Sequence, residues 1–177
     1  MLNPNSPLQR INNFDAALCL QFNRQSRNFY VRNLFRLVSR LGDGIFWYAL
    51  MAALLLRYQQ HALPAVLHML AVALLGTAIY KIIKSKTLRP RPFSVHPFIV
   101  CAGKTLDQFS FPSGHTMHAV SFSIISSYYF PELIWLVMPF AILVALSRPV
   151  LGLHYPTDVL AGVALGATIT AVSFLCV

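Results

Sequence analysis

The sequence predicts an all-α, polytopic membrane helix bundle, and three observations lead to that fold class. Hydrophobic residues make up 56% of the 177 residues and charged residues only 11%, whereas an average soluble domain has roughly 25% charged residues. Five stretches are apolar enough to enter a bilayer, where a span needs about 20 residues. The 14 Lys and Arg outnumber the 5 Asp and Glu, and in so apolar a chain this excess indicates anionic headgroups or phosphate rather than nucleic acid. A disordered tail, a DNA-binding module and a cytosolic enzyme are therefore excluded.

The expected spans cover residues 45–56, 63–83, 115–130, 133–146 and 159–177. The first is short and must borrow residues from both flanks to cross. The third has four serines between residues 121 and 127, and small hydroxyl side chains favour a helix that faces other helices. Gly162 and Gly166 give the fifth a GxxxG spacing, which by itself is a weak sign of helix contact.

Residues 1–40 are expected to form an amphipathic N-terminal helical arm. Apolar side chains recur there at three- and four-residue intervals, first at Ile11, Phe14, Leu18 and Phe22 and then at Val31, Leu34, Phe35 and Val38. The arm either lies in the membrane interface with its arginines among headgroups or packs on the bundle. Residues 41–177 then form a transmembrane catalytic bundle, and the whole chain is one domain. A sixth span inside the arm is the alternative, although Arg24 and Arg27 make it awkward.

Polar residues gather in three clusters, at residues 84–92, 112–115 and 147–158, each at the end of an apolar span. Counting the crossings places all of these junctions on the same side of the membrane. One pocket at headgroup level is therefore expected to collect Lys84, Arg91, Ser113, Gly114, His115, Arg148, His154 and Asp158.

The composition of this predicted pocket suits chemistry on a phosphate. Two arginines, a lysine and a Ser-Gly turn at a helix start form a phosphate cradle. Of the two histidines, one can attack phosphorus through a neutral ring nitrogen while the other protonates the leaving oxygen. Asp158 follows His154 by four residues and is expected to hold one ring nitrogen protonated.

The other histidines differ in what their positions predict, and a metal site is a further alternative. His118 lies one turn beyond His115 and is a candidate for the same pocket, whereas His61, His68 and His96 are expected to be structural or interfacial. A metal site is disfavoured, because few acids or thiols lie near the histidines and the surrounding positive charge repels a dication.

The three clusters resemble the signature of the type 2 phosphatidic acid phosphatase superfamily, whose pattern is Lys-x6-Arg-Pro, Pro-Ser-Gly-His and Ser-Arg-x5-His-x3-Asp. The residues that match are Lys84 with Arg91-Pro92, Pro112 to His115, and Ser147-Arg148 with His154 and Asp158. The Gly42-Asp43-Gly44 entry to the first span also resembles small bacterial members. The resemblance implies that His154 is the nucleophile, that Asp158 orients it and that His115 is the general acid. It implies that Lys84, Arg91, Ser113, Gly114 and Arg148 hold the phosphoryl oxygens, with no metal or organic cofactor.

The resemblance implies a metal-independent phosphatase that removes phosphate from a membrane phospholipid or a polyprenyl (di)phosphate through a phosphohistidine. A phosphotransferase would share every one of these residues. A non-catalytic lipid-phosphate binding protein or flippase would leave His115, His154 and Asp158 unexplained. The expected partners are the lipid substrate and the bilayer, without nucleic acid, and nothing indicates an oligomeric state.

The expected location is the bacterial inner membrane, but the side of the site is left open. Among the 14 Lys and Arg residues only Arg57 falls opposite the predicted pocket, and the positive-inside rule therefore favours the cytoplasm. The resemblance instead implies the outer face, where many bacterial relatives work.

Overall fold

The computed structural model describes residues 7–105 and 107–176, and all of the elements named within them are helices or helical turns. The prediction of an all-α helix bundle is thereby confirmed. Residues 1–6 of the predicted arm and Val177 of the last predicted span lie outside the described residues.

The helices are α1 (Pro7–Arg24), α2 (Phe29–Arg40), α3 (Phe46–Tyr58), α4 (Leu63–Thr87), α5 (Pro92–Val95), α6 (Gly114–Tyr129), α7 (Ile134–Val150) and α8 (Pro156–Ser173). Short helical turns join several of them, at Gln25–Arg27, Leu41–Ile45, Gln59–Ala62 and Pro131–Leu133. Local sequence explains several helix starts. Asn28 caps α2 by accepting hydrogen bonds from the backbone N–H groups of Tyr30 and Val31, and Pro156 opens α8, where a missing N–H costs nothing.

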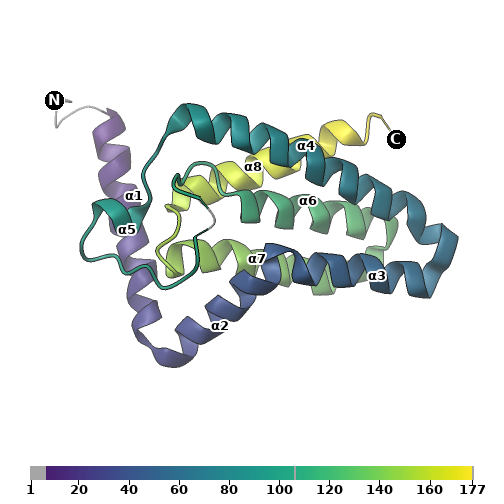
Figure 1. Cartoon of the computed structure of the whole chain (residues 1–177), viewed down its shortest axis with the longest axis horizontal. Coiled ribbons are helices and arrows are strands. Elements are labelled where there is room, and N and C mark those ends of the chain that lie inside the picture. Colours follow the sequence, from purple (N-terminus) through teal and green to yellow (C-terminus); the bar gives the residue numbers. More distant parts are fainter. Residues whose placement is uncertain (1–6, 106, 177) are drawn as a thin grey trace.

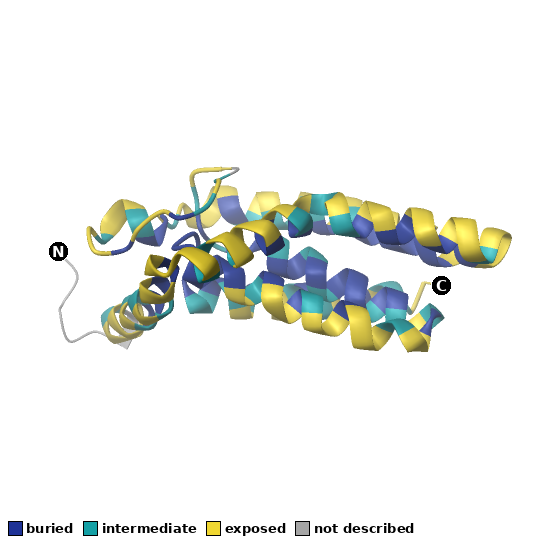
Figure 2. Cartoon of the chain, turned by 90° about the horizontal axis from the view of Figure 1, so that it is seen from below, coloured by how far each residue is buried: buried dark blue, intermediate teal, exposed yellow. Residues whose placement is uncertain are grey.

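The long helices run roughly along one axis, and α1 stands across one end of them (Figure 1). Helix α6 lies in the middle, because it contacts α4, α7 and α8. Buried residues face the interior of the bundle, while the outward surfaces of the helices are largely exposed (Figure 2). The core contains Trp47, Met69, Met117, Ile125 and Val137.

The serine-rich helix faces its neighbours, as predicted. Ser121 is buried on α6, and its hydroxyl donates to the carbonyl of Gly166 on α8 at 3.1 Å. A Cβ at Gly166 would lie 2.5 Å from the carbonyl oxygen of Met117, so only glycine permits this approach of α8 to α6. The GxxxG spacing therefore marks a real helix contact.

The bundle carries the surface of an integral membrane protein. Large apolar side chains are exposed on several helices, among them Leu56, Leu74, Trp135, Leu136 and Leu160. Within the described residues, three helical stretches are long and apolar enough to cross a membrane: Phe29–Thr87, Pro131–Val150 and Pro156–Ser173. The first of them contains α2, α3 and α4, and the central α6 is not among the three. The predicted number of five crossings stays a prediction.

The N-terminal arm packs on the bundle, the second of its two expected arrangements. Helix α1 contacts α7 and α8, and α2 contacts α7. Asp15, Cys19 and Asn23 of α1 are all buried, although the residues between them are partly open to solvent. A polar face of α1 therefore points into the protein at the end where the three clusters of motif residues meet.

Candidate active site

The three clusters converge at the end of the bundle that α1 crosses. They surround a cavity of about 200 Å³, lined by Gly42, Asp43, Tyr80, Lys84, Arg91, Asp107, Gly114, His115, His118, Arg148 and His154. Six of the eight predicted site residues are in this lining, and Ser113 and Asp158 are the other two. His118 lines the same cavity, as its position one turn beyond His115 suggested.

The backbone explains how distant segments reach the cavity. Lys84 lies in the last turn of α4 and Arg148 in the last turn of α7, while Gly114 opens α6. The turn between α7 and α8 depends on Gly152, whose φ is +73° and whose Cβ would lie 2.6 Å from the carbonyl oxygen of Val100. Glycine is needed there both for the dihedral angle and for space. This turn carries His154 into the cavity.

Two of the predicted phosphate ligands share a carboxylate that the sequence did not single out. Asp107 receives Lys84 Nζ at 2.8 Å on Oδ2 and Arg91 Nη2 at 2.8 Å on Oδ1. Burial alone would raise the pKa of Asp107, but its hydrogen bonds to Lys84 and Arg91, with their charges, lower it below the usual value. The carboxylate is thus ionised and occupies the donors that a phosphate would use. No motif spacing marked Asp107, because it lies in the loop between the first two clusters.

Arg148 presents a different situation. Its guanidinium is buried, and Nη1 donates to the Ser39 hydroxyl at 2.7 Å. Nε has no hydrogen-bond partner among the described residues. A buried cation with an unused donor is costly unless an anion approaches it. Its place in the cavity lining therefore favours an anionic ligand there.

His154 is held in one tautomer by a backbone group. Its Nδ1 lies 2.6 Å from the carbonyl oxygen of Ser110, and since a carbonyl only accepts, Nδ1 carries the proton. Nε2 keeps its lone pair and lies 3.5 Å from Arg91 Nη1. Burial, followed by the positive charges of Arg148 and Arg91, lowers the pKa of His154 well below its ordinary value. The ring is therefore neutral near pH 7, as a nucleophile requires.

Asp158 does not make the contact with His154 that we expected. Its Oδ2 lies 3.7 Å from His154 Nδ1, and this oxygen instead accepts the backbone N–H of Tyr155 at 2.8 Å. The other oxygen pairs with Arg89 Nη1 at 2.6 Å. The physical reason is that Asp158 is the third residue of α8. Its carboxylate caps the helix by accepting the backbone N–H of the N-cap residue, as in a capping box. The Ser110 carbonyl, and not the Asp158 carboxylate, is the hydrogen-bond partner of His154 Nδ1.

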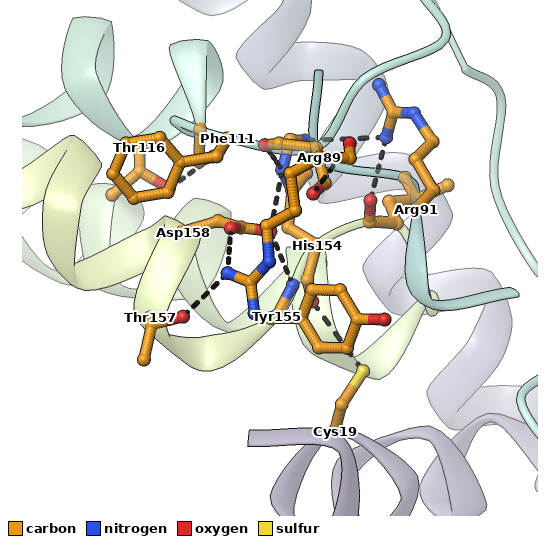
Figure 3. Close-up of polar contacts among 12 residues, drawn as sticks. Cys19, Arg89, Arg91, Phe111, Thr116, His154, Tyr155, Thr157 and Asp158 are labelled. Atoms are coloured by element: carbon orange, nitrogen blue, oxygen red, sulfur yellow. Dashed lines mark hydrogen bonds and ion pairs between the residues drawn. The ribbon is translucent and has the colours of Figure 1, made fainter. Parts of the chain in front are cut away.

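Arg89 is the second residue that sequence reasoning missed, and its guanidinium contacts Thr157 and Asp158 at the start of α8 (Figure 3). Its Nη2 lies 2.6 Å from Asp15 Oδ2, and its Nη1 donates to the Thr157 hydroxyl at 2.8 Å. Asp15 also accepts the backbone N–H of Thr157 at 3.0 Å. The available signal was an Arg-Pro repeated at residues 89–92, inside the first cluster.

Two further residues of α1 hold the same turn. The Cys19 thiol lies 3.6 Å from the carbonyl oxygen of His154. The Asn23 amide donates to the carbonyl oxygens of Val100, at 2.9 Å, and of Val150, at 3.0 Å. Single polar residues on an amphipathic helix form no motif, so the sequence did not associate them with the site.

His115 has a carboxylate partner from the start of the first predicted span. Its Nε2 is hydrogen-bonded to Asp43 Oδ1. Asp43 belongs to the π-helical turn Leu41–Ile45, in which Gly44 has a φ of 133°. His118, one turn further along α6, contacts the Thr77 hydroxyl through Nε2 at 3.2 Å.

An apolar hollow adjoins the cavity. It has a volume of about 170 Å³ and shares Gly42, Asp43 and His118 with the cavity. The rest of its lining is mostly apolar and comes from α3, α4 and α6, including Trp47, Met51, Leu70, Ala73 and Phe122. A polar head in the cavity and an apolar chain in the hollow would therefore be neighbours.

Known proteins with similar sequences act on phosphorylated lipids. The model of the PAP2 superfamily matches residues 65–177. The decaprenylphosphoryl-5-phosphoribose phosphatase of Mycobacterium tuberculosis is 40% identical over 104 residues, which cover 58% of this chain and 55% of that protein. The undecaprenyl-diphosphatase of Sulfolobus acidocaldarius is 29% identical over 140 residues, covering 77% of this chain and 66% of that protein. The first match thus spans little more than half of the relative's length.

A solved structure has the same fold. It is the crystal structure of a transmembrane PAP2 type phosphatidylglycerolphosphate phosphatase from Bacillus subtilis, with a TM-score of 0.74 and 23% sequence identity. The match covers 98% of this chain and 88% of that chain. The helical arrangement described above is therefore one that a membrane enzyme of this kind adopts.

Proposed function

We propose that this chain, which belongs to the PAP2 superfamily, is an integral-membrane phosphatase that hydrolyses a phosphate ester or anhydride of a polyprenyl-linked lipid. The observation that carries the proposal is the meeting of His115 and His154 with three cations, Lys84, Arg91 and Arg148, in one cavity. Relatives named for decaprenylphosphoryl-5-phosphoribose and undecaprenyl diphosphate support a polyprenyl substrate. The hollow beside the cavity supports a substrate with an apolar chain.

The first half of the proposed reaction transfers the phosphoryl group to His154. The Nε2 lone pair attacks phosphorus, the bond from phosphorus to the leaving oxygen breaks, and that oxygen takes a proton from His115. The products of this step are a phosphohistidine and the dephosphorylated lipid. The Ser110 carbonyl accepts a hydrogen bond from Nδ1–H of His154 throughout, so Nε2 stays the nucleophilic nitrogen.

The second half returns the enzyme to its starting state. His115 takes a proton from water, the water oxygen attacks phosphorus, and the bond from phosphorus to Nε2 breaks to release inorganic phosphate. Asp43 contacts His115 and stabilises its protonated form, which is present before the first step and forms again in the second. Lys84, Arg91 and Arg148 neutralise the charge on the phosphoryl oxygens in both transition states. Asp107 must give up its contacts with Lys84 and Arg91 when phosphate binds.

In this proposal Ser113 and Asp158 do not contact the phosphate but hold together the helix starts that line the cavity. The backbone N–H of Ser113 donates to the carbonyl of Asp158 at 3.0 Å, which joins the start of α6 to the start of α8. The Ser113 hydroxyl lies 2.9 Å from that of Thr116. Gly114 and the first turn of α6 thereby present free backbone N–H groups to the cavity.

Phosphate release by the purified protein in detergent tests the proposal. Undecaprenyl diphosphate and phosphatidate serve as substrates, with EDTA present throughout. We expect release by the wild type, none above background by His154→Ala, and no change in His61→Ala, a matched variant of an exposed histidine. Rapid alkaline quenching with ³²P-labelled substrate should trap an acid-labile phosphoprotein in the wild type and none in His154→Ala.

Three outcomes would contradict the proposal. A wild-type rate of phosphate release in His154→Ala would show that His154 is not the nucleophile. Transfer of label to an added alcohol in preference to water would indicate a phosphotransferase. Tight binding of lipid phosphate by the wild type, with no release from any substrate, would indicate a binding protein or flippase.

A further inference from the structure

A second hollow lies directly beside the catalytic cavity. It has a volume of about 590 Å³ and lies between the C-terminal half of α2 and the loop around residues 101–104. Three cations line it, Arg36, Arg40 and Lys104, and its lining contains one carboxylate, Asp43. The balance of charge in this hollow is therefore positive.

The cations of this second hollow are largely free to bind a ligand. Arg36 is anchored by one donor, because its Nε lies 2.5 Å from the carbonyl oxygen of Ala102. Within the part of the chain that the structure describes, neither the Arg40 nor the Lys104 side chain has a hydrogen bond or an ion pair, and both residues are exposed. Lys104 is close enough to interact electrostatically with Asp43. In the catalytic cavity, by contrast, Asp107 already pairs with Lys84 and Arg91.

One layer of side chains separates the two hollows. Asp43 lines both of them and contacts His115 in the first. Ser39 lines the second hollow and accepts a hydrogen bond from Arg148, which lines the first, at 2.7 Å. An anion among Arg36, Arg40 and Lys104 would therefore lie one side chain away from the phosphoryl group that His154 attacks.

We propose that this second hollow binds a second anionic group of the same lipid substrate, an inference that rests on the proposed phosphatase function. The intervening side chains require a spacer between the two groups, so the two phosphates of a directly joined diphosphate would not reach both hollows. The substrate class is a lipid whose cleaved phosphate is joined through a sugar or a polyol to a phosphodiester. Charge-assisted hydrogen bonds from Arg40 and Lys104 to the phosphodiester would then select this class.

The test compares two substrates with the same acyl chains, phosphatidylglycerol phosphate and phosphatidate, in neutral detergent micelles. Only the first has a second phosphate, separated from the terminal phosphate by glycerol. In Arg40→Gln/Lys104→Gln we expect kcat/KM for phosphatidylglycerol phosphate to fall at least about tenfold, as loss of hydrogen bonds to charged groups would produce. The kcat/KM for phosphatidate should change less than about twofold, because phosphatidate has no second phosphate to bond to Arg40 and Lys104. The control Arg24→Gln/Arg27→Gln removes the same charge from two exposed positions, at the end of α1 and in the turn that follows it, and should leave both values unchanged.

Several results would contradict the proposed subsite. An equal loss on both substrates, or the same loss in the control variant, would assign the three cations to general attraction of anionic lipid. A loss that appears only in vesicles containing anionic phospholipid, and equally for both substrates, would assign them to bilayer headgroups. No change on either substrate would show that the hollow is not used.

A binding measurement separates this proposal from the phosphatase proposal. If the wild type released no phosphate from either lipid, the proposed function would fail but the subsite would still be testable. In the His154→Ala background, ribose 1,5-bisphosphate should bind at least about tenfold more tightly than ribose 5-phosphate. When Arg40→Gln/Lys104→Gln is added to His154→Ala, the two sugar phosphates should bind with equal affinity. Equal affinities already in His154→Ala alone would refute the subsite.

Discussion

Arg89 Nη1 lies 2.6 Å from Asp158 Oδ1, in a pair whose carboxylate is wholly buried. The contact joins the first cluster of motif residues to the third. It also uses the oxygen of Asp158 that is not bound to the backbone N–H of Tyr155. We therefore propose that Asp158 positions the turn that carries His154, whose ring nitrogen Nδ1 is hydrogen-bonded to the Ser110 carbonyl instead.

Asp158→Asn should reduce kcat by about 10- to 100-fold, as loss of an indirect support typically does. A direct acceptor in a catalytic triad would cost about 10⁴-fold. The reason is that the amide cannot neutralise Arg89, so the start of α8 loosens without removal of the His154 tautomer contact. Steady-state phosphate release measures the effect, and KM should stay within a few fold. A loss as large as that of His154→Ala would contradict the positioning role.

Asp15→Asn should lower both stability and kcat, although Asp15 lies on the N-terminal helix far from the motifs in sequence. Its carboxylate is buried and holds Arg89 and the Thr157 backbone. Loss of that charge leaves buried donors poorly paired, at a cost of about 1–3 kcal/mol. Thermal unfolding in detergent and phosphate release measure the two effects. Gln21→Ala, an exposed change on the same helix, is the control, and equal effects in both variants would count against the network.

Asp107→Asn should strengthen inhibition by inorganic phosphate, by about tenfold for loss of one competing charged contact. Asp107 pairs with Lys84 and Arg91, and phosphate must displace it from both. Inhibition constants for phosphate, measured with a fixed lipid substrate, test this. Gln108→Ala, at the exposed neighbouring position, should not change them. Weaker inhibition in Asp107→Asn would mean that the carboxylate orders the two cations instead of competing for them.

The stability of the protein should decline as pH falls below the ordinary pKa of histidine, in part because of His154. Its pKa in the folded state is lowered, first by burial and then by Arg148 and Arg91, whereas in the unfolded chain it is about 6.5. Below that pH the unfolded state holds more protons, so the free energy of unfolding falls by up to about 1.4 kcal/mol per pH unit. Apparent Tm measured between about pH 7.5 and about pH 5 should drop less in His154→Asn than in the wild type. Parallel curves would contradict the lowered pKa.

Gly166→Ala should destabilise the bundle by about 1–3 kcal/mol, the usual cost of overpacking a tight contact. The added methyl would lie 2.5 Å from the Met117 carbonyl oxygen, and backbone on both sides must move. Thermal unfolding in detergent measures the change. Ala164→Val adds more volume at an exposed position of the same helix and should have little effect. Equal Tm values for Gly166→Ala and the wild type would show that α6 and α8 can separate at no cost.

The sequence by itself determined the fold class and most of the cavity lining. Long apolar stretches can be stable in a bilayer only as helices, and polar clusters at their ends must gather at the bundle ends. Composition and spacing are local properties, so they located Lys84, Arg91, His115, Arg148 and His154 without tertiary information. The cavity contains all five.

Only the tertiary structure decided the partners of these residues. Asp15 and Asp43 lie in the N-terminal part of the chain, where the motifs do not extend, and they reach the site because α1 and the Leu41–Ile45 turn pack against it. Asp107 forms ion pairs with Lys84 and Arg91 because its loop lies next to the end of α4. The Ser110 carbonyl, a backbone group that no residue type reveals, orients His154. Hydrogen bonds and ion pairs depend on separations of a few ångströms between segments far apart in sequence, and only the packing of the helices sets those separations.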